Sequence, residues 1–419
     1  MEKKRSIFFI IIEKSKSIPL EAKNPRMITF EQALEIVLNQ AVAKTTEFIS
    51  FQVAPGRVLA TSILCDRDMP PFDKSAMDGY ACKRSDLAAP LKVVEVIRAG
   101  IPPVRSIGPG ECAQIMTGAI VPEGADTVIK VEEVEMVEKV EKVIRFIGEK
   151  TSANICFRGE DMQAGELVLE GGTLMGVRHI PILAAVGAVS VEVYRQPSVA
   201  VMATGTELVE PDEMPVVSQI RNTNAHQMIA QLRTLEIRAR YYGIAPDEVD
   251  LTRNRIEQAL KETDVLILSG GVSMGEFDFV PSVLESLGIN ILFQKIAIQP
   301  GKPTLFGTGN GKYVFGLPGN PVSSYFLFEL LIRPFVFKLM GYNWKPLVLR
   351  LEAGKQISRK NASRMGWLPV RIDEPGKVFP VEYHGSAHIM ALKDADGIIP
   401  FPIGKTVIEE GESVDVRSI

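Results

Sequence analysis

Two glycine-containing loops could together hold an anionic ligand. Residues 269–271 (Ser-Gly-Gly) and residues 318–321 (Pro-Gly-Asn-Pro) each end an apolar, β-branched run and precede a helical pattern. A loop of this kind presents unbonded backbone N–H groups and the positive end of a helix dipole at the carboxyl edge of a sheet. Each helix end contributes about 0.3–1 kcal/mol, so the two loops can orient a phosphate without holding it alone. Lys295 and Lys302, which lie between the loops in the sequence, could supply the remaining positive charge.

Six acidic residues fall at the ends of expected elements: Asp73, Asp78, Asp161, Glu207, Asp247 and Asp278. Two carboxylates about 4 Å apart repel each other by about 4 kcal/mol at an effective dielectric constant of about 20. A site that gathers them therefore needs a divalent cation, a proton or a lysine, and oxygen ligands favour Mg²⁺ over zinc. The residues alone thus indicate a Mg²⁺-assisted site for a phosphate-bearing ligand. Replacing Asp247 or Asp278 by alanine and measuring the Mg²⁺ requirement would test this interpretation.

The elements expected to position these residues form an α/β domain. From residue 197 onward, apolar strand patterns alternate with amphipathic helices, which predicts three layers around a mostly parallel sheet. Ligands of such sheets bind outside the carboxyl ends of the strands. An earlier helix is expected to begin at a capping box formed by Thr29 and Gln32.

Short β-branched segments broken by glycine and proline predict β structure in residues 91–147 and after residue 341. In the motif that precedes the first of these regions, Asp73 and Asp78 flank small residues. Gly79 is expected to allow a tight turn there. An Asx-turn with two solvated carboxylates explains this motif as well as a functional role does.

Bulk composition excludes several classes of protein. The chain of 419 residues is too long for a single hydrophobic core, and its net charge of −4 argues against nucleic acid as the main partner. No apolar run reaches the roughly 20 residues of a membrane-spanning helix. Four scattered cysteines without a CxxC spacing indicate free thiols in a reducing compartment. We therefore expect a cytoplasmic, multidomain protein without a nucleic-acid or membrane partner.

Seven motifs occur in the order in which one known family has them: PPFDKSAMDGYA, IMTGAIVPEGAD, RGEDM, ATGTEL, SGGVSMGEFDFV, KIAIQPGKP and GLPGNPVSSYF. From residue 28 to its C-terminus the chain resembles the molybdopterin molybdenumtransferase (MoeA) family, to which the E domain of gephyrin also belongs. The resemblance implies a multidomain α/β plus β fold. Its parts are a tail (1–26), an extended β-rich domain (27–66 and 159–195) whose first helix is free to pack on the α/β domain, an inserted β domain (67–158), a MogA-like three-layer α/β molybdopterin-binding domain (196–340) and a C-terminal β domain (341–419).

The same resemblance implies a homodimer, with its site in a cleft between the α/β domain of one subunit and the inserted domain of the other. The implied reaction inserts molybdate, or tungstate, into adenylylated molybdopterin, with Mg²⁺-dependent cleavage of the phosphoanhydride and release of AMP. A molybdopterin adenylyltransferase, which makes that substrate, is the further partner that this reaction suggests.

By motif position, the resemblance carries the family's functional residues onto this chain. Catalytic roles fall on Asp78, Thr117, Asp161, Glu207, Asp247, Asp278 and Lys295, and Asp247 and Asp278 are also the implied Mg²⁺ ligands. Contacts to the molybdopterin substrate fall on Ser269, Gly270, Gly271, Ser273, Lys302, Pro318, Gly319, Asn320, Pro321, Arg364 and Ser386.

The chain also departs from the family's pattern. Gln299 stands where the family usually has a second lysine, and residues 384–387 are His-Gly-Ser-Ala where the family tends toward Gln-Gly-Ser-Gly. The lost cation motivates the hypothesis of weaker molybdate affinity or a preference for tungstate.

Two other functions stay open. The α/β domain alone resembles a molybdopterin adenylyltransferase, and the relationship to gephyrin allows a molybdopterin-binding scaffold. The extra domains and the DGYA motif argue against the first, and the retained acidic residues favour an enzyme over the second.

Overall fold

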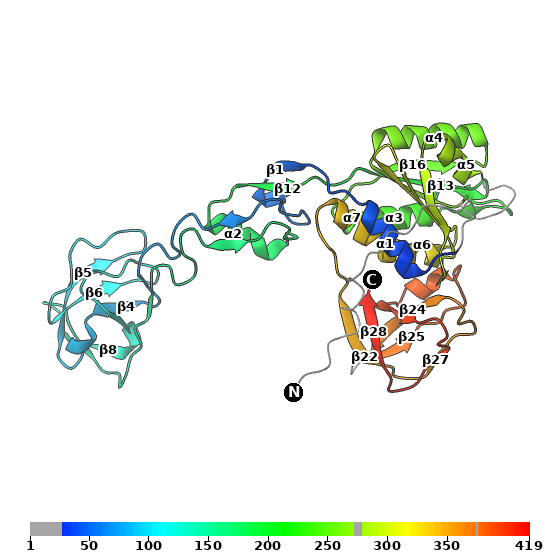
Figure 1. Ribbon diagram of the computed structural model, residues 1–419. Coiled ribbons are helices and arrows are strands. Elements are labelled where there is room, and N and C mark those ends of the chain that lie inside the picture. Colours follow the sequence, from blue (N-terminus) through cyan, green and yellow to red (C-terminus); the bar gives the residue numbers. More distant parts are fainter. Residues whose placement is uncertain (1–26, 272–278, 374–375) are drawn as a thin grey trace. The chain divides into compact units, whose positions relative to one another are not determined.

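The computed structural model describes residues 27–271, 279–373 and 376–419, which fall into two compact units (Figure 1). Unit 1 contains residues 27–43 together with residues 196–419, and unit 2 contains residues 44–195. The predicted combination of an α/β region with separate β regions is confirmed by the sheets of the two units. Within the described ranges, no helix is long and apolar enough to cross a membrane.

A six-stranded sheet forms the centre of unit 1. Its order is β16 (Arg240–Ala245), β13 (Val199–Thr204), β17 (Val265–Ser269), β21 (Lys312–Leu317), β20 (Pro303–Gly309) and β18 (Asn290–Lys295). The first four strands run parallel, as the alternating pattern predicts, whereas β20 pairs antiparallel with both β21 and β18. The carboxyl ends of β16, β13, β17 and β21 therefore lie at one edge of the sheet, and β18 runs in the same direction.

Helices cover both faces of this sheet (Figure 1). The helices α4 (Val249–Glu262) and α5 (Val280–Ser286) lie on one face, where Met202, Leu266 and Leu284 belong to one buried cluster. The other face carries α3 (Asn224–Arg233), α6 (Pro321–Leu327) and α7 (Arg333–Leu339). This arrangement gives the three layers that the sequence predicts.

The first helix, α1 (Phe30–Gln40), begins at the expected capping box and belongs to unit 1. The Thr29 hydroxyl accepts a hydrogen bond from Gln32 N at 3.2 Å, and Gln32 Oε1 accepts one from Thr29 N at 3.0 Å. Phe30 contacts Trp367 edge-on, with ring centroids 5.9 Å apart. The helix is therefore fixed both by its cap and by an aromatic contact to the C-terminal β region.

The buried Glu329, in a π-helical turn of residues Phe328–Ile332 between α6 and α7, forms an ion pair with the partly buried Arg333 at the start of α7. Glu329 is 3% exposed and accepts two hydrogen bonds from Arg333, at 2.5 and 2.9 Å, and one from Gln231 of α3 at 2.8 Å. Arg417, in the last strand of the chain, donates to the carbonyl oxygen of Glu329. Burial lowers the pKa of Arg417 to about 10, so it still carries its charge at neutral pH. The C-terminal region is thus joined to the helix layer at this turn.

The C-terminal β region forms a second six-stranded sheet in unit 1, with several of its strands labelled in Figure 1. Its order is β19 (Ile298–Gln299), β24 (Met365–Asp373), β26 (Gly397–Phe401), β28 (Ser413–Ser418) and β22 (Val348–Glu352), and β25 (Lys377–Pro380) pairs with β24. The short strand β19 comes from the chain segment that links β18 to β20, so Gln299 pairs with Gly366 in this second sheet.

Unit 2 is a β structure. Its six-stranded sheet has the order β7 (Thr127–Lys130), β4 (Gly79–Cys82), β6 (Glu111–Ile115), β5 (Leu91–Ile97), β9 (Val143–Phe146) and β8 (Val134–Glu138). Two-stranded ladders join β1 (Thr46–Ser50) to β12 (Ser190–Tyr194) and β2 (Ile63–Leu64) to β11 (Leu167–Leu169), beside the short helix α2 (Ile180–Ala185).

Gly79 corrects one expectation from the sequence. The residue lies inside β4, paired with β6 on one side and β7 on the other, and its φ is not in the left-handed region. A Cβ atom added to it would lie 1.9 Å from the carbonyl oxygen of Ile129. The expected tight turn at Gly79 is therefore wrong, and a glycine is needed here because β7 approaches closely.

Replacing Gly79 by alanine should push β7 away from β4 and destabilise unit 2 by about 3 kcal/mol, because the backbone atoms that the methyl group meets cannot swing aside. Thermal unfolding measures this change. Gly110→Ala is the matched control: φ is +74° there and an added Cβ meets nothing within 4 Å, so about 1–2 kcal/mol of left-handed strain is the whole cost. Equal destabilisation of the two variants would contradict the explanation.

Candidate active site

The glycine turn after β17 lies against Thr204, the last residue of β13, at the carboxyl edge of the central sheet. A Cβ atom added to Gly270 would lie 2.3 Å from the carbonyl oxygen of Thr204, and one added to Gly271 would lie 2.7 Å from the Thr204 hydroxyl oxygen. Both glycines have left-handed backbones, with φ of +92° and +61°. Space and backbone conformation therefore both require glycine at these two positions.

The hydroxyl of Thr204 faces this glycine turn and is buried. It has no hydrogen-bond partner among the residues that the structure describes. A buried polar group without a partner costs about 1–3 kcal/mol. This oxygen is therefore a candidate contact for a polar ligand at the turn.

Asn224 ties the two glycine-containing loops together from the start of α3. Its side-chain nitrogen donates to the Ser269 hydroxyl at 2.8 Å and to the Gly319 carbonyl oxygen at 2.8 Å. Asn224 is 5% exposed, so both bonds are protected from water. Sequence reasoning missed this residue, and the available signal was a polar Asn-Thr-Asn run, residues 222–224, directly before an amphipathic helix.

The second loop also contacts the C-terminal β region. Asn320 Nδ2 donates to the Ser386 hydroxyl at 2.9 Å, and Val322 N donates to the Ser386 carbonyl oxygen at 3.1 Å. Pro318 is buried, whereas Gly319 and Asn320 are exposed. The structure thus brings together the predicted contacts at 269–271, 318–321 and Ser386 within unit 1.

Glu207 and Asp247 follow neighbouring strands of the same edge. The Asp247 carboxylate accepts hydrogen bonds from the backbone N and the hydroxyl of Thr206, at 3.0 and 3.2 Å. The Glu207 carboxylate folds back over Gly205, where an added Cβ would lie 2.5 Å from Oε2. Both acidic side chains are exposed at the surface, so they can reach a ligand.

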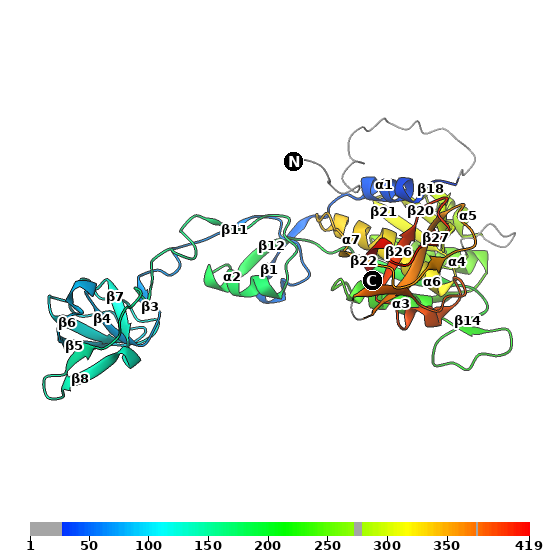
Figure 2. The same cartoon turned by 90° about the horizontal axis from the view of Figure 1, so that it is seen from below.

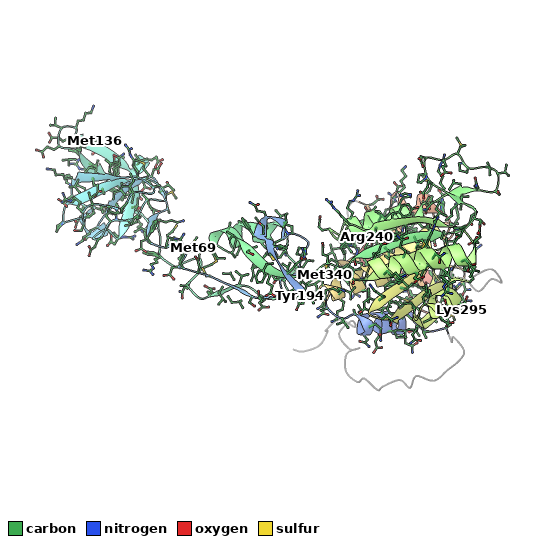
Figure 3. The ribbon with its side chains drawn as sticks, turned by 90° about the horizontal axis from the view of Figure 1, so that it is seen from above. Met69, Met136, Tyr194, Arg240, Lys295 and Met340 are labelled. Carbon is green, nitrogen blue, oxygen red and sulfur yellow. The ribbon has the colours of Figure 1, made fainter. Side chains whose placement is uncertain are left out.

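Lys295 and Lys302 lie at the same edge as the glycine-containing loops. Lys295 ends β18, which runs parallel to β17, and Lys302 directly precedes β20. Figure 3 labels Lys295 near α1, consistent with the hydrogen bond from Ile28 N to its carbonyl oxygen. β20 lies between β18 and β21 in the sheet, and neighbouring strands are about 4.8 Å apart. The end of β18 therefore lies about 10 Å from the end of β21. The two lysines can therefore contribute charge from one side of the edge.

A hollow of about 450 Å³ lies in the C-terminal β region, lined in part by Gln299, Trp367, Tyr383 and His384. Gln299 Oε1 and Trp367 Nε1 are buried, and within the described part of the chain neither has a hydrogen-bond partner. Burial raises the pKa of Tyr383 to about 12, so its hydroxyl keeps its proton at neutral pH. Arg364 donates to the Ile298 carbonyl oxygen at 3.2 Å, next to Gln299 in the chain.

In unit 2, the predicted residues Asp78 and Thr117 form one cluster. Asp78 Oδ1 accepts from Thr117 N at 2.6 Å and from the Thr117 hydroxyl at 2.8 Å. The backbone bond is the larger cause, and the hydroxyl bond the second, of a lowered pKa at Asp78. The carboxylate is therefore held ionised and in a fixed orientation.

Asp161 lies at a separate turn of unit 2. Its backbone N donates to the Met69 carbonyl oxygen at 3.0 Å, and its side chain is exposed. Among the described residues, no hydrogen bond joins Asp161 to Asp78 or Thr117. Nearby, Arg158 forms an ion pair with Asp68 at 2.7 Å.

Two predicted site residues, Ser273 and Asp278, lie outside the described residues. Within the described ranges, no group of three or more His, Cys, Asp or Glu side chains could hold a metal ion. Asp247 still offers Oδ1, because both Thr206 bonds go to Oδ2. An exposed carboxylate oxygen is the ligand type that Mg²⁺ prefers, and Mg²⁺ commonly binds one or two carboxylates together with substrate phosphates.

Three family models match the chain in order. The MoeA N-terminal region (domain I and II) matches residues 28–187, the probable molybdopterin binding domain matches residues 200–338, and the MoeA C-terminal region (domain IV) matches residues 353–419. The chain belongs to the MoeA family of molybdopterin molybdenumtransferases. The resemblance inferred from the seven motifs is thereby confirmed.

Individual MoeA proteins align over nearly the whole chain. Relatives from Bacillus subtilis and Staphylococcus epidermidis, both named molybdopterin molybdenumtransferase, are 33% and 32% identical over 422 and 407 residues. These alignments cover 98% and 95% of this chain and 96% of each relative. Two solved structures of MoeA proteins from Pyrococcus horikoshii have TM-scores of 0.77 and 0.78 at 32% and 27% identity, and cover 94% of this chain and 99% and 100% of theirs. The MoeA fold, with its MogA-like α/β domain, is thus confirmed.

Replacing Asn224 by alanine should destabilise unit 1 by about 1–3 kcal/mol, because the buried Ser269 hydroxyl and the Gly319 carbonyl oxygen both lose their donor. Chemical denaturation measures this loss. Asn320→Ala removes one exposed hydrogen bond and should cost less than about 1 kcal/mol. The assignment of Asn224 as the tie between the loops would fail if the two variants were equally stable.

The Asp78–Thr117 contact should make the stability of unit 2 depend on pH. Because the folded-state pKa of Asp78 is lowered below its ordinary value of 3.8, its contribution is present above about pH 4 and is lost as the pH falls through the folded-state pKa. The difference in melting temperature between the wild type and Asp78→Asn, followed from pH 7 to pH 3, should therefore stay constant down to about pH 4 and begin to shrink below it. A difference that stays constant across this range would contradict the expectation.

Proposed function

We propose that this MoeA protein inserts molybdenum from molybdate, or tungsten from tungstate, into molybdopterin, with adenylylated molybdopterin as the second substrate and AMP as the released product. The observation that carries the proposal is the pair of loops at residues 269–271 and 318–321, joined by Asn224 at the carboxyl ends of the parallel strands β17 and β21. Open α/β sheets bind phosphorylated ligands at this edge. The relatives named molybdopterin molybdenumtransferase support the same chemistry for this chain.

The proposed phosphate end of the site lies at these loops. Backbone N–H groups of the glycine turn and the Thr204 hydroxyl would bind phosphate oxygens, and Lys295 and Lys302 would offset their charge. Mg²⁺, held by Asp247 together with Asp278, would supply charge neutralisation of the phosphoanhydride when bound. The chain's own residues thus bind and orient the anhydride, and no covalent intermediate on the protein is needed.

The proposed oxyanion end lies toward the C-terminal β region. Ser386, Arg364 and the hollow beside Gln299 offer hydroxyl, guanidinium and amide groups to an oxyanion. In unit 2, Asp78, Thr117 and Asp161 are proposed to act in the same reaction. These roles follow from motif position and from the accessible acidic side chains of unit 2.

We further propose that the protein acts in the cytoplasm as a homodimer and receives its substrate from a molybdopterin adenylyltransferase. Analytical ultracentrifugation tests the dimer, and a sedimentation coefficient of a monomer at micromolar concentration would reject it. Incubation with ATP and molybdopterin tests the competing function, because adenylylated product formed by this chain alone would make it the adenylyltransferase.

Asp247→Ala should raise the Mg²⁺ concentration needed for half-maximal AMP release by about tenfold or more, because one anionic ligand of the proposed ion is lost. Chromatographic detection of AMP during a Mg²⁺ titration measures the shift. Asp250→Ala, an exposed acidic residue in the first turn of α4, is the matched control. An unchanged Mg²⁺ requirement in Asp247→Ala would remove this residue from the metal site.

Gln299→Lys should restore a cation beside the hollow and lower the KM for molybdate by about threefold to tenfold. This range corresponds to about 1 kcal/mol of attraction between the added charge and the oxyanion. Parallel assays with molybdate and tungstate measure the preference of each protein. Identical affinities and preferences in wild type and variant would reject a role for Gln299 in oxyanion choice.

A further inference from the structure

A long loop of residues 207–222 leaves the carboxyl end of β13 and returns to the start of α3 (Figure 2). Glu207 is its first residue, β14 (Leu208–Val209) forms the outgoing leg and β15 (Ile220–Arg221) forms the returning leg. None of the residues 211–220 is buried. The loop therefore has no core of its own and depends on contacts at its two legs.

Backbone hydrogen bonds between the legs are few. The strands β14 and β15 form a parallel ladder of two residue pairs and pair with no other strand among those described. Ile220 N donates to the Glu207 carbonyl oxygen at 2.8 Å, and Asn222 N donates to the Val209 carbonyl oxygen at 2.8 Å. An isolated two-stranded ladder is marginal in water, so side chains must supply the rest of the stability.

The hydroxyl of Tyr241, on the edge strand β16, joins the two legs. It donates to Glu210 Oε1 on the outgoing leg at 2.6 Å and accepts from Asn222 Nδ2 on the returning leg at 2.8 Å. Burial, and then the Glu210 carboxylate, raise the pKa of Tyr241, so the phenol keeps the proton that it donates. Asn222 is 2% exposed, and its Oδ1 accepts from Ala225 N at 3.3 Å, which anchors the returning leg to α3.

His226 on α3 gives Glu210 a second contact. Its Nε2 lies 3.2 Å from Glu210 Oε2, and its ring centroid lies 5.4 Å from that of Tyr241. One carboxylate is therefore shared between the sheet edge and the helix. This fixes the outgoing leg three residues after Glu207.

We propose that Glu210, Tyr241 and Asn222 form a clamp of positioning residues that holds Glu207 in place for the reaction. The returning leg binds the Glu207 carbonyl oxygen directly, so separating the legs frees the residue. Thr206, the residue before Glu207, is bonded to Asp247. The clamp thus keeps Glu207 in register with the loop that carries Asp247. Only the catalytic consequence of the clamp rests on the proposed function.

Tyr241→Phe and Tyr242→Phe form a matched pair for the test. Tyr242 is the next residue of β16, and its hydroxyl donates at 2.8 Å to Glu262 of α4, away from the loop. Each variant loses a phenolic hydroxyl bonded to a glutamate. Tyr241→Phe also takes an acceptor from the buried Asn222 amide, so its loss of global stability should be the larger of the two. Hydrogen exchange of the amides in residues 208–221 should become about tenfold faster in Tyr241→Phe and stay unchanged in Tyr242→Phe, because only the first opens the clamp.

Steady-state kinetics of the full chain with adenylylated molybdopterin, molybdate and Mg²⁺ complete the test. In Tyr241→Phe, kcat should fall about tenfold with less than about twofold change in KM, since a misplaced group costs rate more than binding. Tyr242→Phe should keep both constants within about twofold of wild type.

Three outcomes would count against these proposals. Equal exchange rates in the two variants overturn the clamp whatever the reaction is. Faster exchange with an unchanged kcat overturns the positioning role. A wild-type chain without insertion activity contradicts the proposed function, while the exchange comparison still decides whether the clamp exists.

Discussion

The candidate site depends on one side-chain amide. The two N–H groups of Asn224 bind the Ser269 hydroxyl and the Gly319 carbonyl oxygen, so both donors are used and the amide cannot turn without losing both bonds. Neighbouring parallel strands are about 4.8 Å apart, which is a gap that one carboxamide can span. The glycine turn against Thr204 and the exposed Asn320 take their positions from the loops that this amide joins.

Other parts of unit 1 hold the two loops bonded by Asn224 in place from two sides. The C-terminal β region meets the α6–α7 helix layer at two points. Ser386 bonds to Asn320 near the site, and Arg417 of β28 donates to the carbonyl oxygen of Glu329 in the π-helical turn. Removing Arg333 would leave the charge of the buried Glu329 uncompensated, so the turn depends on this pair. On the other side of the site is the edge strand β16, which contains Tyr241 and is followed by Asp247. A rigid sheet thus presents both the acidic residues and the side chains that orient them.

Local patterns were sufficient to predict the elements and the residues at their ends. The capping box at Thr29, the alternation after residue 197 and the loops at 269–271 and 318–321 are properties of contiguous sequence, and the structure has all of them. The strand β20 was not predicted, because its sequence begins with a proline and contains two glycines, which are typical of a loop. Its antiparallel direction could not be predicted either, because an apolar run has the same pattern in both directions.

Contacts between segments that are distant in the sequence could not be predicted. Asn224 binds groups 45 and 95 residues away, and the need for Gly79 comes from a strand about 50 residues further on, so no local spacing encodes either. The same holds for Tyr241, which looks like an ordinary strand residue until Glu210 and Asn222 are placed beside it. Ser273 and Asp278 lie outside the described residues, and their proposed roles rest on motif position.

The loops joined by Asn224 are proposed to bind the phosphate end of the substrate. A crystal structure of the protein soaked with AMP, Mg²⁺ and molybdate would show where the phosphate lies. We expect nucleotide phosphate density against residues 269–271 and 318–320, with a metal ion at Asp247. Phosphate density elsewhere, for example in the hollow beside Gln299 with the glycine turn empty, would contradict it.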